Sequence, residues 1–320
     1  MASEFSIIEQ YFNRSLSRPD VMCGIGDDAA IVQVPPHESL VVTTDTLNVG
    51  VHFPADASPA DIAYKALMVN LSDLAAMGAT PRWITLSLTL PETNADWLHA
   101  FSQSLHCALQ EVGVALIGGD TTRGPLSVSI TAMGSVNPTF SYLRSEAKMG
   151  DIIAVTGTLG DAGLGLQCAL HQRQLNRIEN TGYVLTRLHR PQARLSISTA
   201  LHGLTRCAID LSDGLASDLS HILKQSHCGA IVNVDDLPLS IALTQESDAD
   251  EQIELALCAG DDYELCFCIP PVHWEDAVKK AAATGVVLTP VGVITVGEKI
   301  DWKKDNQPYV MHKRGWDHFA

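Results

Sequence analysis

Short motifs in which aspartate stands beside glycine, serine or threonine recur along the chain. They are Gly26-Asp27-Asp28, Thr43-Thr44-Asp45, Ser72-Asp73, Gly118-Gly119-Asp120-Thr121-Thr122, Asp210-Leu211-Ser212-Asp213-Gly214 and Gly260-Asp261-Asp262. Carboxylate and hydroxyl oxygens are hard ligands, and Mg²⁺ typically takes one or two carboxylates together with waters and phosphate oxygens. Glycine lets the backbone approach a phosphate and present its N–H groups. Each motif alone is also typical of a turn or helix cap, but their recurrence favours a site for Mg²⁺ and phosphate.

Asp73 is the most specific of these residues. The run Asp61–Met77 predicts a helix that ends just before Gly78. Apolar residues cover most of this helix, and Asn70 and Asp73 share one face because they are three residues apart. An ionised carboxylate on such a helix is costly unless it is paired or bound to a metal. The alternative is a solvated polar stripe that binds nothing.

The elements around these motifs divide the chain into two parts. In the first part, apolar patterning predicts strands at 40–46, 83–90 and 126–136 and helices at 61–77 and 94–112. In the second part, it predicts extended segments at 152–157, 229–234, 264–269 and 286–295 and helices near 162–172 and 273–284. Turn formers and charges fill residues 137–150. We therefore expect an α/β (α+β) chain with domains at 1–137 and 150–320.

Other features that could bind phosphate are less specific. The chain has no GxxxxGK[ST] motif, which disfavours a P-loop kinase. The glycines of the turn Gly157–Gly165 follow a strand, but their GxxGxxGxG spacing differs from the dinucleotide fingerprint, so close helix–strand packing is the better interpretation. Arg123 and Arg144 could each meet a phosphate or lie on the surface.

Two ring side chains could line the same pocket. His52 follows the TTDT strand, and Trp316 lies near the end of the chain, where a flat apolar ring could stack on a heteroaromatic ligand. The alternatives are a histidine satisfied within the fold and a tryptophan that anchors the terminus. The acidic run 235–254 is interpreted as a solvated loop and helix face rather than a site.

Composition excludes several classes of protein. The chain has 320 residues and a net charge of −16, so a nucleic-acid partner is not expected. Its apolar runs are too short to span a membrane, and its first residues do not form a signal peptide. The eight cysteines form no CxxC pair. We expect reduced thiols and a cytoplasmic enzyme.

Six strings taken together are highly specific. GIGDDAA, TTDTLNVGVHF, YKALMVNLSDLAAMGATP, LIGGDTTRGPL, DLSDGLASDL and GDDYELCF occur in this order. In order and spacing they resemble the thiamine-monophosphate kinase family, within the superfamily of aminoimidazole ribonucleotide synthetase. The resemblance covers essentially the whole chain. It implies a two-domain α/β fold in which the N-terminal sheets of two subunits pair into a barrel-like homodimer, with residues 1–137 binding metal and ATP.

The resemblance also implies a reaction: ATP phosphorylates thiamine monophosphate to thiamine diphosphate with several Mg²⁺ ions. The implied metal ligands are Asp28, Thr43, Thr44, Asp45, Asp73, Asp120, Asp210 and Asp213, with Asp27 beside them. Gly119, Asp120, Arg144 and Ser212 would hold ATP. His52, Asp261 and Trp316 would hold thiamine monophosphate; the family often has Glu at the position of Asp261. No covalent nucleophile is expected, and Asp45, Asp120 and Asp210 are the most critical ligands.

Three alternatives stay open. Another member of the superfamily could act on a different acceptor, although selenophosphate synthetases carry a reactive Cys or selenocysteine near the glycine loop and hydrogenase-maturation relatives end in cysteine. This chain has only Cys23 early and ends in His318-Phe319-Ala320. A non-catalytic module could bind nucleotide or divalent ions to regulate a partner. A dinucleotide enzyme could use the turn Gly157–Gly165.

Overall fold

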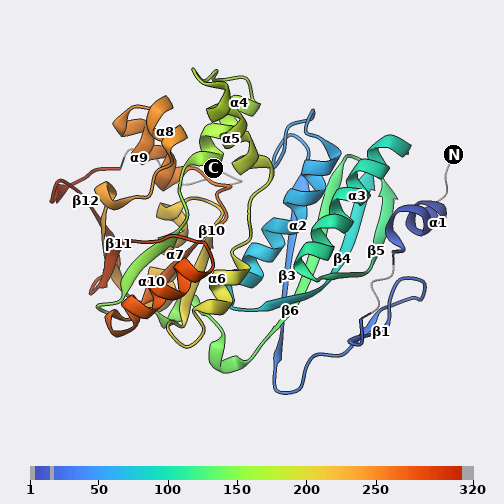
Figure 1. The fold of residues 1–320 in the computed structure, drawn as a ribbon, viewed down its shortest axis with the longest axis horizontal. Helices are drawn as coiled ribbons and strands as arrows, with labels where there is room; N and C mark the ends of the chain where they lie inside the picture. The colour runs from blue at the N-terminus through green and yellow to red at the C-terminus, as the bar shows by residue number, and fades with distance from the viewer. Residues whose placement is uncertain (1–3, 15–17, 312–320) are drawn as a thin grey trace. The chain divides into compact units, whose positions relative to one another are not determined.

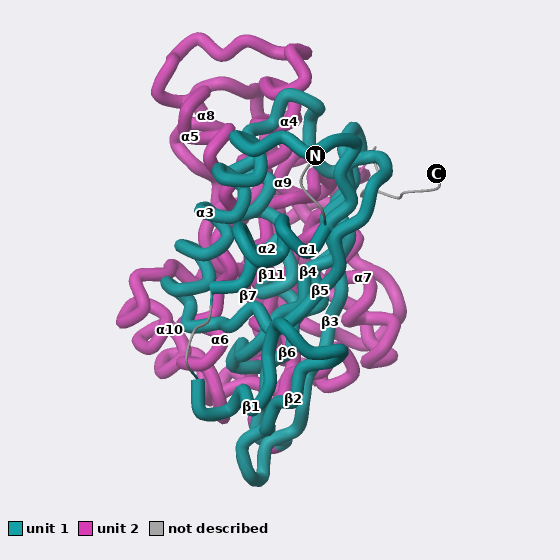
Figure 2. Tube along the Cα trace, turned by 90° about the vertical axis from the view of Figure 1, so that its right-hand side faces the viewer, with its two compact units in different colours: residues 1–74, 79–138 teal, residues 75–78, 139–320 magenta. Residues whose placement is uncertain are grey.

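The computed structural model describes residues 4–14 and 18–311. The chain forms two compact units, residues 1–74 with 79–138 and residues 75–78 with 139–320, which are coloured separately in Figure 2. Each unit is built around a sheet of its own (Figure 1). Among the described residues, no helix combines the length and the apolar character that a membrane span requires.

The first unit is an antiparallel and parallel mixture of strands with two long helices. Its elements are α1 (Glu4–Ile7), a π-helical turn (Ile8–Phe12), β1 (Val21–Cys23), β2 (Ile31–Val32), β3 (Ser39–Asn48), α2 (Pro59–Ala76), β4 (Thr80–Leu90), α3 (Ala95–Val112), β5 (Ala115–Arg123) and β6 (Ser127–Val136). Four of the strands form a sheet in the order β3-β6-β4-β5, in which only β4 and β5 are parallel. Strands β3 and β5 are therefore its two edges.

The two faces of this sheet differ. Helices α2 and α3 lie over one face (Figure 1), and the side chains that point towards them include the buried Leu47, Leu88 and Ile130. The opposite face carries hydroxyl side chains, with Thr44 bonded to Thr131 across the strands. We call it the hydroxyl face. The part of the hydroxyl face around Trp83 and Ile117 is covered by the β1–β2 hairpin, whose apolar residues pack against these two side chains.

The second unit is larger. Its elements are β7 (Ile152–Thr156), α4 (Asp161–Ala169), α5 (Ile178–His189), α6 (Leu195–Ala200), β8 (Cys207–Leu211), α7 (Leu215–Ser226), β9 (Gly229–Asn233), α8 (Ile241–Glu246), α9 (Ala249–Cys258), β10 (Glu264–Ile269), α10 (Trp274–Ala283), β11 (Leu288–Thr295), β12 (Ile300–Lys304) and β13 (Gln307–Pro308), with 3₁₀ turns at Pro138–Phe140, Arg144–Glu146, Val234–Asp236 and Pro271–His273. Its seven strands form one mixed sheet in the order β13-β12-β9-β11-β7-β10-β8.

Alternating residues of this second sheet serve two cores. On β10, Cys266 and Cys268 pack with α7 and α9, whereas Leu265 and Phe267 pack with α6 and α10. Successive side chains of a strand point to opposite faces, so a strand that is apolar on both faces is buried between two helical layers. The second unit is therefore a three-layer α/β/α arrangement.

The predicted elements are confirmed for the most part. The helix expected at 61–77 is α2, and Gly78 adopts the left-handed conformation (φ 70°) just beyond it. The glycines of the turn Gly157–Gly165 serve close packing, but the closest approach of Gly165 is to a helix rather than to a strand as predicted: a Cβ on Gly165 would lie 2.3 Å from the carbonyl oxygen of Val184 in α5. The acidic run 235–254 contains α8 and the first part of α9, in line with the predicted loop and helix face, but Glu246 within it is buried rather than solvated.

Candidate metal and phosphate site

Thr43, Asp45, Asn70 and Asp73 form one group, the Asp45 group, on the helix-covered face of the first sheet. The hydroxyl of Thr43 donates to Asp73, and Asn70 Oδ1 accepts from the backbone N–H of Asp45 at 3.0 Å. Burial, and then the negative charge of Asp73, raise the pKa of Asp45 to about 6. Two partly buried carboxylates that repel one another create a favourable position for a divalent cation.

The position of Asn70 decides between the two interpretations of helix α2. Asn70 is fully buried, and its Nδ2 donates to the carbonyl of Ala66 at 2.9 Å. It therefore fixes β3 against the helix and is not part of a solvated stripe. Asp73, one turn further along, is half-buried and faces the same strand through Thr43.

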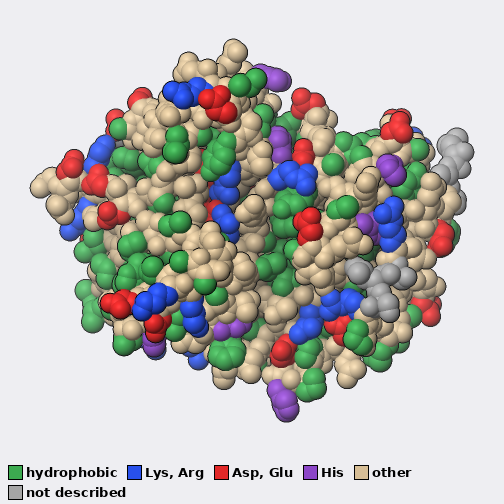
Figure 3. Space-filling view, viewed as in Figure 1, with side chains coloured by type: hydrophobic (Ala, Val, Ile, Leu, Met, Phe, Trp, Pro, Cys, Tyr) green, Lys and Arg blue, Asp and Glu red, His purple; other side chains and the backbone are tan. Residues whose placement is uncertain are grey.

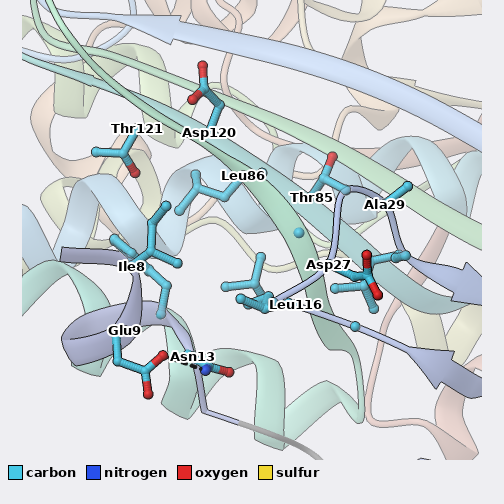
Figure 4. Close-up of a pocket in the computed structure, with 18 of the residues that line it drawn as sticks. Ile8, Glu9, Asn13, Asp27, Ala29, Thr85, Leu86, Leu116, Asp120 and Thr121 are labelled. Carbon is cyan, nitrogen blue, oxygen red and sulfur yellow. Dashed lines mark hydrogen bonds between the residues drawn. The ribbon is translucent and has the colours of Figure 1, made fainter. Parts of the chain in front are cut away.

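A second group lies at the edge strand β5. A pocket of about 840 Å³ opens there between the N-terminal segment, the loop 24–30 and residues 116–121. Its polar wall carries the exposed carboxylates of Asp27, Asp28 and Asp120, and its apolar wall includes Phe5 and Ile8. We call it the Asp120 pocket. Figure 4 shows that the side chains of Asp120 and Thr121 leave the strand in different directions, with Thr121 on the side of Ile8.

The backbone of β5 is unusually close to β4 at this pocket. Gly119 has φ 150°, and a Cβ there would lie 1.8 Å from the carbonyl oxygen of Leu86. The register of β4 against β5 shifts just before this point, between Ile84 and Thr85. Only glycine fits this approach, which leaves the strand backbone at Gly118 and Gly119 bare towards the pocket.

The first unit holds the Asp45 group and Asp120 apart. Asp45 lies on one edge strand and Asp120 on the other, three strand spacings away, or about 14 Å. They also lie on opposite faces: Asp45 points towards the helices, whereas Asp120 is paired with Ser87 on the hydroxyl face. Thr44 belongs to the hydroxyl face too, because it alternates with Thr43. The expected ligands of this unit therefore form two sets rather than one cluster.

The remaining expected ligands belong to the second unit. Asp210 is the last residue but one of β8 and is buried, and Ser212 and Asp213 follow the strand in the loop before α7. The backbone N–H of Asp213 donates to the carboxylate of Asp218 at 3.0 Å. Burial raises the pKa of Asp218 to about 7, while the positive charge of Arg144 opposes that rise. The 3₁₀ turn Arg144–Glu146 contacts β8 and α7, so Arg144 is near this loop, as a ligand for a phosphate would have to be.

Asp261 stands in a turn beside the same loop. Its backbone N–H donates to the carbonyl of Ser212 at 2.9 Å. Asp261 adopts a left-handed backbone conformation (φ 71°), which is costly for a residue other than glycine. The structure thus brings Asp210, Ser212, Asp213 and Asp261 together at one end of the second sheet.

His52 and Arg123 have different surroundings. His52 Nδ1 accepts from the backbone N–H of Asn48 at 3.0 Å, and its carbonyl accepts from Lys65 at 3.2 Å, so this histidine closes the turn after β3. Arg123 is exposed at the end of β5. Trp316, expected on the substrate side, lies outside the described residues.

Sequence reasoning did not single out Asp218. The sequence feature that could have identified it is its position in the first turn of α7, from which a carboxylate can turn back and accept a hydrogen bond from the backbone N–H of Asp213. The apolar wall formed by Phe5 and Ile8 was also missed. These residues are far from the glycine loop in sequence, so no local pattern joins them.

The donor sets fit Mg²⁺ better than a metal held by protein alone. Within residues 4–14 and 18–311, no three His, Cys, Asp or Glu side chains are grouped closely enough to enclose an ion. Magnesium needs no such cage, because it usually takes one or two carboxylates and completes its shell with waters and phosphate oxygens. The Asp45 group supplies two carboxylates and a hydroxyl, which matches this requirement.

Family models and relatives agree across the chain. Residues 26–136 match the N-terminal domain of AIR synthase related proteins, and residues 148–303 match the C-terminal domain. The thiamine-monophosphate kinase of Salmonella typhimurium is 46% identical over 319 residues, which cover 99% of this chain and 98% of the relative. That of Bacillus subtilis is 34% identical over 328 residues, covering 99% of both.

Solved structures agree as well. The crystal structure of thiamine-monophosphate kinase from Stenotrophomonas maltophilia K279a has a TM-score of 0.87 and 43% identity, covering 96% of this chain and 98% of that one. A structure described as AaThiL complexed with AMPPCP and TMP has a TM-score of 0.78 and 29% identity, covering 92% of both chains. This chain, with its two-domain α/β fold, therefore belongs to the thiamine-monophosphate kinase family of AIR synthase related proteins.

Proposed function

We propose that the protein transfers the γ-phosphoryl group of ATP to thiamine monophosphate, giving ADP and thiamine diphosphate. The observation that carries this proposal is 46% identity to a thiamine-monophosphate kinase along 99% of the chain. A related structure is described as a complex with AMPPCP and TMP, an ATP analogue and a phosphate acceptor. The carboxylate sets described above suit that pair of ligands.

The acceptor explains why the site is acidic and carries no activated nucleophile. The attacking oxygen belongs to a phosphate that is already anionic, so the protein has to place two polyanions in line and offset their repulsion. Mg²⁺ ions, when bound, would neutralise phosphate oxygens on both substrates. The protein's own task is to hold those ions and to present backbone N–H groups and arginine to the phosphates.

The residues divide by role in this proposal. Metal would be held by Asp28, Thr43, Thr44, Asp45, Asp73, Asp120, Asp210 and Asp213. The bare backbone at Gly119, together with Asp120, Arg144 and Ser212, would hold ATP, and the apolar wall of the Asp120 pocket offers a surface for its base. His52, Asp261 and Trp316 would hold thiamine monophosphate; of these, His52 would act through the turn that it closes.

A homodimer is part of the same proposal. On the hydroxyl face, Leu40 and Val42 are 47% and 55% exposed, which is unusual for neighbouring apolar side chains on a sheet. A second copy that pairs its sheet with this one into a barrel would cover them. It would also supply what a single copy separates, because Asp45 and Asp120 lie on opposite edges and faces. We place residues 1–137 in this metal-binding and dimerisation role and the protein in the cytoplasm.

The surface agrees with small anionic substrates rather than nucleic acid. The net charge is −16, and basic and acidic side chains are interspersed on the face shown in Figure 3. A phosphate backbone would require a continuous basic surface.

The proposal is tested by following the γ-phosphate of labelled ATP. We expect label in thiamine diphosphate when thiamine monophosphate and magnesium are present, and none when an aminoimidazole ribonucleotide precursor replaces thiamine monophosphate. A regulatory module would bind ATP with magnesium in a calorimeter yet show no heat with thiamine monophosphate. Either that result or transfer only to the precursor would overturn the proposal.

A further inference from the structure

The turn Gly260–Tyr263 is held in a strained conformation against the loop that carries Ser212. Both Asp261 (φ 71°) and Tyr263 (φ 50°) occupy the left-handed region, on either side of Asp262. Their backbone N–H groups donate to the carbonyls of Ser212 and Leu211, each at 2.9 Å. A Cβ on Gly260 would lie 2.3 Å from the carbonyl oxygen of Ser212, so the two segments are pressed together.

Asp262 ties this turn to helix α4. Its side chain is buried, with 3% of the residue exposed, and its two carboxylate oxygens accept from the backbone N–H groups of Gly160 (2.6 Å) and Ala162 (3.1 Å). These are N–H groups of the first turn of α4, which have no partner within the helix. The carboxylate therefore occupies the position where a dinucleotide enzyme would bind phosphate.

The segment that carries Asp262 is also fixed by hydrogen bonds of Glu264. Glu264, two residues further on, is fully buried and accepts from Thr156 (2.6 Å), Arg187 (2.9 Å) and Arg194 (2.6 Å). Arg187 also donates to the carbonyl of Thr158 at 3.2 Å, just before α4. The helix terminus and the start of β10 are thus joined by charged hydrogen bonds.

Two non-glycine residues with positive φ persist only where the surroundings determine them. The backbone bonds to Ser212 and Leu211 hold the turn on one side, and Asp262 holds it on the other. Without Asp262, the turn can relax towards negative φ and carry Asp261 away from Ser212. Because the carboxyl of Asp262 is buried, its pKa is raised to about 7.

We propose that Asp262 is a positioning residue: by capping α4, it holds the strained turn that presents Asp261 to the substrate. This inference rests on the proposed function, in which Asp261 contacts thiamine monophosphate. It assigns no contact with substrate to Asp262 itself. Its effect on the KM for thiamine monophosphate passes through Asp261 alone, which gives the proposal a distinctive signature.

The signature is a double-mutant cycle. Asp262→Asn keeps the shape but places an NH₂ group against one of the two N–H donors. We expect it to raise the KM for thiamine monophosphate about tenfold, while the KM for ATP stays within about twofold. In an Asp261→Ala background, Asp262→Asn should raise the KM for thiamine monophosphate no further, because the side chain that it positions is gone. Equal effects in both backgrounds would overturn the proposal.

Asp248→Asn is the matched control. Asp248 also caps a helix, accepting from the N–H groups of Asp250 (3.1 Å) and Glu251 (3.0 Å) at the start of α9, but it is outside the turn. We expect both KM values to stay at the wild-type level in this variant. If Asp262→Asn does not unfold cooperatively, Asp262→Ser replaces it, because serine is a common helix cap with one acceptor oxygen.

Amide hydrogen exchange separates this proposal from the proposed function. In Asp262→Asn, and not in Asp248→Asn, the amides of Asp261 and Tyr263 should exchange at least about tenfold faster than in the wild type. Unchanged protection would overturn the anchoring role even if the kinetics changed. A wild-type protein that fails to phosphorylate thiamine monophosphate would overturn the proposed function, whereas the exchange result would still decide whether Asp262 holds the turn.

Discussion

In the absence of metal, the ionised carboxylate of Asp45 should lower the free energy of unfolding of the protein at neutral pH. Its pKa is about 6 in the folded chain instead of 3.8, because it is partly buried next to Asp73. At 1.36 kcal/mol for each pKa unit, the full difference is about 3 kcal/mol, and partial exposure to water reduces it to about 1–2 kcal/mol. The folded state binds the proton more tightly, so this cost is absent below about pH 4, grows between pH 4 and 6, and is complete above pH 6.

Asp45→Asn removes the charge and keeps the backbone N–H that Asn70 accepts from. In the presence of a chelator, we expect the variant to have a free energy of unfolding about 1–2 kcal/mol larger than the wild type at pH 8, and an equal one near pH 4. Urea titrations at both pH values measure this difference. Magnesium should stabilise the wild type at pH 8 more than the variant, because a bound cation offsets the repulsion between Asp45 and Asp73.

Asp56→Asn provides the control for this experiment. Asp56 is an exposed residue of the same unit, so the substitution makes the same change in charge without relieving burial. Its effect on the free energy of unfolding should stay within about 0.5 kcal/mol at either pH. If Asp45→Asn destabilises the protein at pH 8, or changes its stability equally at pH 4 and pH 8, then burial and the charge of Asp73 do not raise the pKa of Asp45 as described above.

Four further outcomes are expected. Asp45→Asn or Asp120→Asn should lower kcat by at least about a hundredfold with an unchanged circular dichroism spectrum; turnover within about threefold of the wild type would count against that ligand. Gly119→Ala should lower the free energy of unfolding, measured in urea, by about 1–3 kcal/mol, because the added Cβ would lie 1.8 Å from the carbonyl oxygen of Leu86. Gly118→Ala should change the free energy of unfolding little, because its Cβ would have no neighbour nearer than 3.9 Å. Equal effects of the two substitutions would refute the close approach of β5 to β4. Val42→Asp should give a monomer in light scattering. If one site takes residues from two copies, co-refolding Asp45→Asn with Asp120→Asn should restore about a quarter of the wild-type activity. No recovery of activity would place both carboxylates of a site in one copy.

Local patterns predicted the elements that carry the Asp45 group. Gly78 and the apolar run before it located the end of α2, and the compact β-branched run 40–46 located β3. Successive side chains of a strand point to opposite faces, which places Thr43 and Asp45 on one face and Thr44 on the other. A single ligand set that contains all three residues therefore already conflicted with the predicted strand. The division of Asp45 from Asp120 could not be predicted, because it depends on the strand order β3-β6-β4-β5.

The second unit was predicted less completely. Helices α5, α6 and α7 and strand β8 were not identified, although α7 follows directly on the motif at Asp213. Glu246 lies in a run that is typical of a solvated surface, yet it is buried and accepts from Asn180 at 2.9 Å. Its partners are distant in sequence, and a satisfied buried carboxylate cannot be distinguished from an exposed one without them.

Anomalous scattering from Mn²⁺ tests most directly whether these carboxylates hold divalent cations at the phosphates. Crystals would be grown with Mn²⁺, a non-hydrolysable ATP analogue and thiamine monophosphate. We expect anomalous peaks within about 2.5 Å of the carboxylate oxygens of Asp45 or Asp73, and further peaks at Asp120 and at Asp210 or Asp213, each also contacting a phosphate oxygen. If both ligands are present at full occupancy and no anomalous peak lies at any of these carboxylates, the metal-assisted mechanism is contradicted.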